Sequence, residues 1–174
     1  MVRRAFRGRN HSAWSCDLAP ARDSQQYHIQ KDIIETIELL PWDLIILHPS
    51  CQYIANCGNR WHAGTAARAR AIAWTHVLWS AACKAADRVC LENPVGLSLF
   101  SIKPQWVNPW EFGHGETKKT GLWLHNLPDL VPTDIVKGRS PRVWKMAPSA
   151  TRSRDRATTY LGLADAMAAQ WGSL

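Results

Sequence analysis

The sequence predicts an α/β fold with a mainly parallel sheet, and two observations predict it. Short apolar segments alternate along the chain with stretches that have helical spacing. Residues 44–47 are apolar at every position, which is typical of a strand buried on both faces in a parallel sheet. We therefore expect helices on both faces of the sheet, in a single domain over residues 1–174.

Five apolar segments have the length and composition of strands. They cover residues 13–16, 27–29, 44–47, 89–91 and 121–124. Between them, residues 49–64 and 95–120 are rich in Gly, Pro and Asn, and we expect them to be irregular. Residues 126–159 contain four prolines and most of the C-terminal basic residues, so a loop-rich basic segment is expected there.

Three stretches have the pattern of helices. Residues 33–40 place apolar side chains on one face, with Asp32 and Glu35 spaced as a capping box and Pro41 ending the helix. Residues 65–86 are rich in alanine and lack Pro and Gly, which predicts the longest helix. Residues 161–171 predict a closing helix.

The net charge of +7 is concentrated near the two ends of the chain. Residues 1–10 carry +4 and residues 137–156 carry +6, whereas residues 11–136 carry −2. A cationic cluster beside a near-neutral body suits a polyanion, and nucleic acid is the common case. The alternative is a solvated basic tail.

The expected location is the cytoplasm. No apolar run approaches the roughly 18 residues that cross a bilayer, and we expect no membrane partner. No apolar segment follows the N-terminal arginines, so a signal peptide is not predicted. The odd number of cysteines, five, argues against a secreted disulfide scaffold.

Polar or nucleophilic residues follow four expected strands in turn. They are Asp17, Asp32, the segment His48-Pro49-Ser50-Cys51, and the segment Glu92-Asn93-Pro94. Ligands of open parallel sheets bind beyond the carboxyl ends of the strands. The sequence therefore predicts a site at this edge.

Cys51 is the candidate nucleophile of this site. His48, Arg60 and His62 are close to it in sequence, and positive neighbours favour the reactive thiolate. Glu92 is the candidate acid/base partner. Cys16, Cys83 and Cys90 have the positions of core residues, whereas the role of Cys57 stays undecided.

A zinc site is the alternative use of these residues. His48, Cys51, Cys57 and His62 have intervening spacings of two, five and four residues, without the paired Cys-x-x-Cys of zinc knuckles. We expect no metal.

Pro49-Ser50-Cys51-Gln52 followed by Leu91-Glu92-Asn93-Pro94 resembles the catalytic pair of motifs in DNA cytosine-5 methyltransferases. Most of the chain resembles small phage- and prophage-encoded proteins of this kind, in residues 13–17, 48–51, 92–94, 112–120 and 162–168. The resemblance implies a Rossmann-like, S-adenosylmethionine-dependent methyltransferase fold. The implied activity is methyl transfer to cytosine in DNA.

The resemblance also implies roles for individual residues. Cys51 would add to C6 of cytosine, Glu92 would hydrogen-bond N3 and the exocyclic amine, and Asn93 would hold the loop. The base would have to leave the stack to reach them. Asp17, Asp32 and Pro49 would bind S-adenosylmethionine. Substrate or DNA contacts would come from Gln52, Arg60, Lys118, Lys119, Thr120, Arg152, Arg154 and Arg156.

Several of these residues have plainer interpretations. Asp32 has the position of a helix cap, and Asp17 that of a turn residue before Pro20. The alternative for Lys118 and Lys119 is that they are solvated surface side chains. The alternative for Glu92 is that it caps the next segment.

The sequence departs from the family pattern in three places. The family fold opens with a strand and a glycine-rich turn for the cofactor, whereas residues 1–7 resemble the helix after that turn and Gly8 is the only glycine before Gly58. We therefore expect an N-terminally truncated fold that uses a second chain or copy to complete the sheet, or that has lost the cofactor. Ser50 replaces the usual proline, and residues 95–159 leave little room for target recognition.

Two other functions stay open. One is a catalytically inactive DNA-binding or decoy homologue, which the missing glycine turn favours. The other is a Cys-dependent enzyme that modifies a pyrimidine nucleotide.

Overall fold

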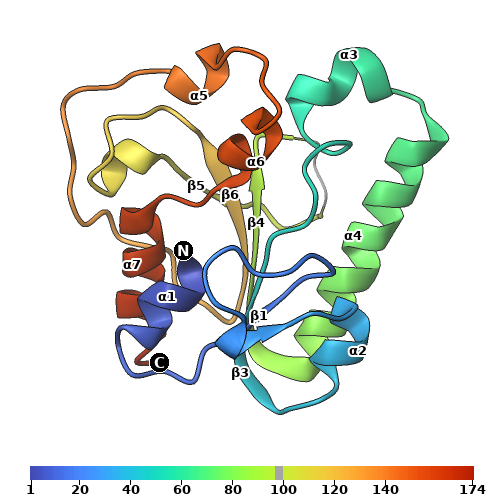
Figure 1. Ribbon diagram of the computed structural model, residues 1–174, viewed down its shortest axis with the longest axis vertical. Helices are drawn as coiled ribbons and strands as arrows, with labels where there is room; N and C mark the ends of the chain where they lie inside the picture. Colours follow the sequence, from blue (N-terminus) through green and yellow to red (C-terminus); the bar gives the residue numbers. More distant parts are fainter. Residues whose placement is uncertain (97–99) are drawn as a thin grey trace. The chain divides into compact units, whose positions relative to one another are not determined.

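The computed structural model is a mixed α/β structure that describes residues 1–96 and 100–174, without the side chains of residues 57, 153 and 154 (Figure 1). The chain forms two compact units. Unit 1 consists of Met1–Thr36, Asn108–Lys118 and Leu130–Leu174. Unit 2 consists of Ile37–Val107 and Lys119–Asp129. Each unit is described by itself.

Unit 2 contains a four-stranded sheet in the order β3-β4-β6-β5. Its strands are β3 (Trp42–Leu47), β4 (Ala86–Pro94), β5 (Gln105–Val107) and β6 (Thr120–His125). The predicted strands at 44–47, 89–91 and 121–124 are confirmed and are longer than predicted, whereas β5 was not predicted.

The prediction of a mainly parallel sheet is wrong. β3 and β4 are parallel, but β6 runs antiparallel to both β4 and β5. A parallel neighbour requires a crossover connection, usually a helix. In the described part of the chain between β4 and β6, the only helical segment is the single turn η3 (Pro109–Glu111). The sheet is therefore mixed.

The long helix of unit 2 is α4 (Ala66–Ala85), close to the predicted 65–86. Thr65 caps it, because the Thr65 hydroxyl accepts a hydrogen bond from Arg68 N at 3.3 Å. α4 packs against β3 and β4 and continues directly into β4 at Ala86 (Figure 1). Before α4, the expected irregular segment contains two short helices, η2 (Asn56–Gly58) and α3 (Asn59–His62).

Aromatic side chains form much of the packing in unit 2. The Phe100 ring lies 4.9 Å from His76, 5.2 Å from Trp79 and 6.0 Å from Trp123, measured between centroids. A Cβ at Gly121 would lie 3.1 Å from the Trp123 ring, so glycine leaves room for the indole. This cluster contains two of the ten tryptophans of the chain, Trp79 and Trp123.

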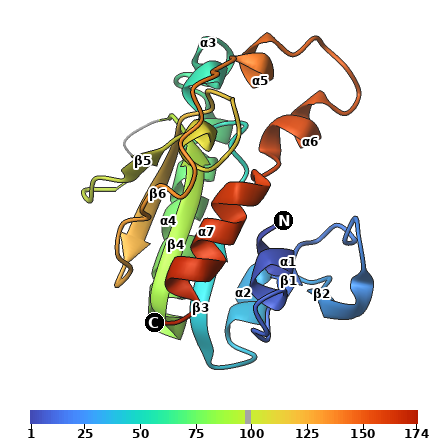
Figure 2. The ribbon, with the colours of Figure 1, turned by 90° about the vertical axis from the view of Figure 1, so that its left-hand side faces the viewer.

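Unit 1 contains α1 (Val2–Arg7) packed against α7 (Leu161–Trp171) (Figure 2). The predicted closing helix at 161–171 is confirmed. α7 contains Gly162 and many alanines, and it buries Leu163, Met167 and Trp171. α1 in turn buries Ala5 and Phe6.

Two predicted strands of unit 1 form a sheet of their own. β1 (Ser15–Cys16) pairs in parallel with β2 (His28–Ile29), which follows the short helix η1 (Gln25–Tyr27). Neither strand joins the four-stranded sheet. The prediction that four consecutive strands present one common edge is therefore wrong.

The helix predicted at 33–40 is shorter in the structure. α2 is Ile33–Ile37, and Leu40 is exposed. Asp32 caps it through Oδ1, which accepts from Ile34 N at 2.8 Å. Glu35, the second residue of the predicted capping box, is exposed. The cap of this helix therefore comes from Asp32.

The segment 126–159 is loop-rich, as predicted, with two short helices. They are α5 (Arg142–Lys145) and α6 (Arg152–Ala157). Glu116, which is buried, holds α5 by accepting from Val143 N at 3.1 Å and from Arg142 Nε at 3.2 Å. Among the described residues, no helix is both long and apolar enough to span a bilayer.

Candidate functional site

In unit 2, the parallel strands β3 and β4 bring two predicted motifs to one edge. Leu47 pairs with Leu91, so His48 follows beside Glu92. Nδ1 of His48 lies 3.3 Å from Oε2 of Glu92. Glu92 is buried and His48 is exposed. The sequence analysis named His48 beside Cys51 and in the alternative zinc site but missed its contact with Glu92, although both residues directly follow paired apolar segments.

The loop that carries Cys51 is attached to the chain that follows Glu92. Asn56 N donates to Val95 O at 3.0 Å, and Ala55 forms a β-bridge with Gly96. A Cβ at Gly96 would lie 2.4 Å from Ile54 O, so only glycine allows this close approach. Cys51 itself is half-buried. The two predicted motifs, residues 48–51 and 92–94, therefore belong to one local structure.

Glu92 and Asn93 lie inside a strand and not beyond it. β4 extends to Pro94, and Glu92 and Asn93 pair with Leu122 and Gly121 of β6. The side chain of Asn93 is 1% exposed, and its amide oxygen and nitrogen have no hydrogen-bond partner among the described residues. An unsatisfied buried amide is costly, and both polar groups of Asn93 are in this state.

The other cysteines differ from Cys51 in their surroundings. Burial, together with the negative charge of Glu92, raises the pKa of the Cys90 thiol well above its usual range. Burial also raises the pKa of Cys83, which is half-buried on α4. Cys16 donates to Lys31 O and to Thr36 Oγ1, both at 3.3 Å. Thiolate chemistry at neutral pH is thus disfavoured at Cys83 and Cys90.

The alternative zinc site involves Cys57, whose side chain lies outside the described residues. Among the side chains that are described, no three His, Cys, Asp or Glu residues gather as a metal site requires.

Asp17 and Asp32, the residues expected to bind S-adenosylmethionine, lie in unit 1 and serve their own backbone. Oδ1 of Asp17 accepts from Ala19 N at 2.9 Å in a turn, and Oδ1 of Asp32 caps α2. Pro49, the third expected cofactor residue, lies in unit 2. Gly8 ends α1 in a helical conformation and forms no turn around a ligand. The residues present therefore do not fit the cofactor by themselves.

The motif with Lys118, Lys119 and Thr120 is divided between the units. Lys118 Nζ, in unit 1, donates to Thr158 O at 3.3 Å. Lys119 Nζ, in unit 2, lies 4.8 Å above the Trp106 ring. Thr120 is buried in β6 opposite Pro94. Lys118 is thus bonded to the protein, whereas Lys119 is exposed beside the Trp106 ring.

The remaining expected DNA-binding residues have mixed environments. Gln52 and Arg60 are exposed in unit 2. Arg156 donates to Val143 O at 3.0 Å, which gives it a structural role in unit 1. Arg152 is half-buried, and its Nε has no partner in the described part of the chain. The side chain of Arg154 lies outside the described residues.

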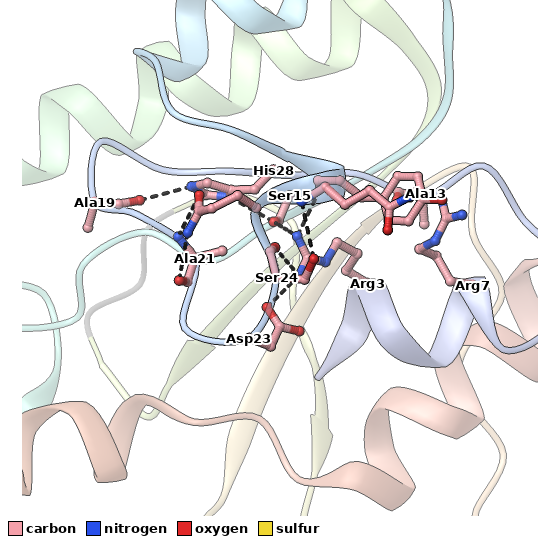
Figure 3. A network of polar contacts seen from close by, with 12 residues as sticks. Arg3, Arg7, Ala13, Ser15, Ala19, Ala21, Asp23, Ser24 and His28 are labelled. Atoms are coloured by element: carbon pink, nitrogen blue, oxygen red, sulfur yellow. Dashed lines mark hydrogen bonds and ion pairs between the residues drawn. The ribbon is translucent and has the colours of Figure 1, made fainter.

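Half of the N-terminal arginines are used inside unit 1. Arg3, with only 9% of its side chain exposed, donates to Ser15 Oγ and Tyr27 O and pairs with Asp23 (Figure 3). Arg7 lies 3.1 Å from the centroid of the Tyr27 ring. Arg3 and Arg7 therefore have structural roles in unit 1. The other two, Arg4 and Arg9, are exposed.

No protein-family model matches the chain, and no curated protein matches it significantly. The interpretation of the site therefore depends on its geometry and chemistry.

Proposed function

We propose that the chain is a DNA cytosine-5 methyltransferase-like enzyme in which Cys51 attacks cytosine and Glu92 binds the ring. The observation that carries the proposal is the attachment of the Cys51 loop to the strand that holds the His48–Glu92 pair. The finer fold in this proposal is a Rossmann-like methyltransferase domain. The parallel strands β3 and β4, joined by α4, support it.

The chemistry of the proposed step suits these side chains. The Cys51 thiolate forms a bond to C6, and the displaced electron pair makes C5 nucleophilic. Glu92 hydrogen-bonds N3 and the exocyclic amine, where charge develops during the attack. His48, exposed and paired with Glu92, is placed to exchange protons between that carboxyl group and water.

DNA is the proposed partner because of charge. Unit 1 carries fourteen Lys and Arg against nine Asp and Glu, which gives +5. Even with Arg3 and Arg7 used internally, exposed cations remain on this unit, and they would neutralise phosphates.

S-adenosylmethionine is proposed as the methyl donor only on the resemblance of the motifs. Oδ1 of Asp17 and Oδ1 of Asp32 each accept a hydrogen bond from a backbone N–H of their own turn. The addition to C6 is the part of the reaction that the described residues support.

The addition can be tested without any methyl donor. When Cys51 is bound at C6, C5 accepts a proton from water. Loss of the original C5 hydrogen, followed by release of the thiolate, then returns cytosine with solvent hydrogen at C5. We expect the protein to release tritium from DNA that contains 5-tritiated cytosine, and Cys51→Ala to release none. Cys83→Ala, which removes a half-buried thiol on α4, is the matched control and should exchange like the wild type. Absence of exchange, or equal exchange by Cys51→Ala, would overturn the proposed chemistry.

Calorimetric titration with S-adenosylmethionine and analysis of the product separate the remaining possibilities. Binding and a new methyl group at C5 would support the complete proposal. Exchange without cofactor binding would favour a Cys-dependent pyrimidine-modifying enzyme. DNA binding without exchange would favour an inactive DNA-binding homologue.

A further inference from the structure

Trp144 is exposed to solvent in unit 1, in a cationic stretch of the sequence. It lies on α5 and is 72% exposed, and the side chain of Arg142, two residues earlier, is 74% exposed. Lys145, on its other side, is exposed as well. Tryptophan is enriched at interfaces, because its side chain combines a large apolar surface with a polar N–H group.

The turn beneath Trp144 is fixed by hydrogen bonds. Val143 is buried, its N–H donates to Glu116 Oε1 at 3.1 Å, and its carbonyl accepts from Arg156 at 3.0 Å. Arg142 Nε donates to Glu116 Oε2 at 3.2 Å. Because α5 is held at Val143, the exposed indole of Trp144 is carried by an ordered turn. Pre-organised display of an aromatic side chain lowers the entropic cost of binding.

The stretch of sequence that contains α5 is cationic. Residues 135–154 contain no acidic residue, and their cations are Lys137, Arg139, Arg142, Lys145, Arg152 and Arg154. Glu116, which reaches this turn, is buried and paired with Arg142. The Arg139 guanidinium lies 3.7 Å from the Trp110 ring centroid, a second pairing of a cation with an aromatic ring.

We propose that α5 binds an unpaired nucleic-acid strand, with a base stacked on Trp144 and phosphates contacted by Arg142 and Lys145. Aromatic side chains between cations bind single strands in this way, because every base has a flat face and every linkage has a phosphate. Paired bases inside a duplex do not offer that face. The inference rests on the proposed DNA partner, but not on the chemistry of Cys51.

An anionic membrane is a less suitable partner for this surface. Helices that lie in a membrane interface present a wide apolar face. On α5, Val143 is buried, and Trp144 is the one large apolar side chain that the turn exposes.

The test measures binding of a fluorescent oligothymidine of about 20 nucleotides, and of a duplex of equal length, to the full chain. One stacked base is worth roughly 1–3 kcal/mol, so Trp144→Ala should weaken single-strand binding by about 5- to 150-fold and duplex binding much less. Trp144→Phe should retain most of the affinity. Lys145→Ala should lower the salt dependence of binding by about one phosphate contact.

Trp74→Ala is the matched control. Trp74 is 44% exposed on α4, with Ala73 and Thr75 as its neighbours, and its removal should leave single-strand affinity unchanged. The proposal is overturned if Trp144→Ala binds like the wild type, if Trp74→Ala weakens binding equally, or if neither nucleic acid binds. It is also overturned if Trp144→Ala loses binding to phosphatidylserine vesicles but not to the oligonucleotide. If Trp144 is required for binding while the C5 hydrogen does not exchange, the proposed single-strand binding surface is supported and the proposed Cys51 chemistry is refuted.

Discussion

Nδ1 of His48 lies 3.3 Å from Oε2 of Glu92, and the two residues come from neighbouring parallel strands. The pair connects a buried carboxylate to an exposed imidazole. It therefore offers a short route for a proton between the proposed cytosine site and water.

Glu92→Gln should lower the rate of tritium release from C5 by about 100-fold or more, because general acid–base catalysis typically contributes factors of this size. His48→Asn should lower it less, since water can replace an exposed imidazole as the proton carrier. Glu38→Gln, at an exposed carboxylate of unit 2, is the matched control. The measurement is the initial rate at saturating DNA. A Glu92→Gln variant that exchanges at the wild-type rate would contradict the assignment.

Gly162→Ala should destabilise unit 1 by about 2–4 kcal/mol, as overpacking of a tight contact does. A Cβ at Gly162 would lie 1.9 Å from Phe112 O, and Gly162 N also donates to His114 Nε2 at 2.9 Å. Gly138→Ala is the control, because nothing lies within 4 Å of its Cβ position. Thermal unfolding of both variants measures the difference. Equal melting temperatures would show that α7 does not approach Phe112 as described.

Iodoacetamide at neutral pH should label Cys51 before Cys83 and Cys90. The raised pKa values of Cys83 and Cys90 leave little thiolate, and Cys90 is also inaccessible. Peptide mass spectrometry over a time course gives the order of labelling. In denaturant, the differences should disappear. Labelling of Cys90 in the native protein at the rate of Cys51 would be incompatible with the burial of β4.

Asp23 should contribute to acid sensitivity. Backbone hydrogen bonding at Ser24, followed by the hydrogen bond from Arg3, lowers its pKa from 3.8 to about 2. A carboxyl group with a lowered pKa stabilises the folded state above its unfolded value, and that stability is lost as the pH falls through the folded value. Between about pH 4 and pH 2, the melting temperature of the wild type should therefore fall more steeply than that of Asp23→Asn. Asp129→Asn is the control, and parallel curves for wild type and Asp23→Asn would refute the role of the Arg3 network.

Local patterns in the sequence predicted individual elements well. The alanine-rich stretch without Pro and Gly predicted α4, and the closing helix α7 was predicted as well, because helix formation depends mostly on residues that are close in sequence. The direction of β6 was not predictable in the same way, since the connection before it sets the direction and the strand residues do not. β5 was missed because its three residues carry too short a pattern.

The sequence predicted only part of the candidate site, because the pairing of strands, like their direction, is not a local property of the sequence. Cys51 follows β3 and Glu92 lies near the end of β4; because these two strands pair, the two motifs meet in unit 2. Asp17 and Asp32 follow strands that pair only with each other, in unit 1. The sequence does not encode locally which strands share a sheet. The ion pair between His48 and Glu92 depends on strand register, which is also a property of the assembled sheet.

The direct passage from Ala85 of α4 to Ala86 of β4 makes this part of the chain intolerant of changes in length. Successive side chains of a strand point to opposite faces, so Cys90 and Glu92 share one face and Leu91 and Asn93 the other. No loop lies between helix and strand to absorb an added or deleted residue. A single-residue insertion there would move Leu91 to the place beside His48 and turn the carboxylate to the opposite side of the sheet. During evolution, this junction should therefore accept substitutions far more readily than insertions or deletions.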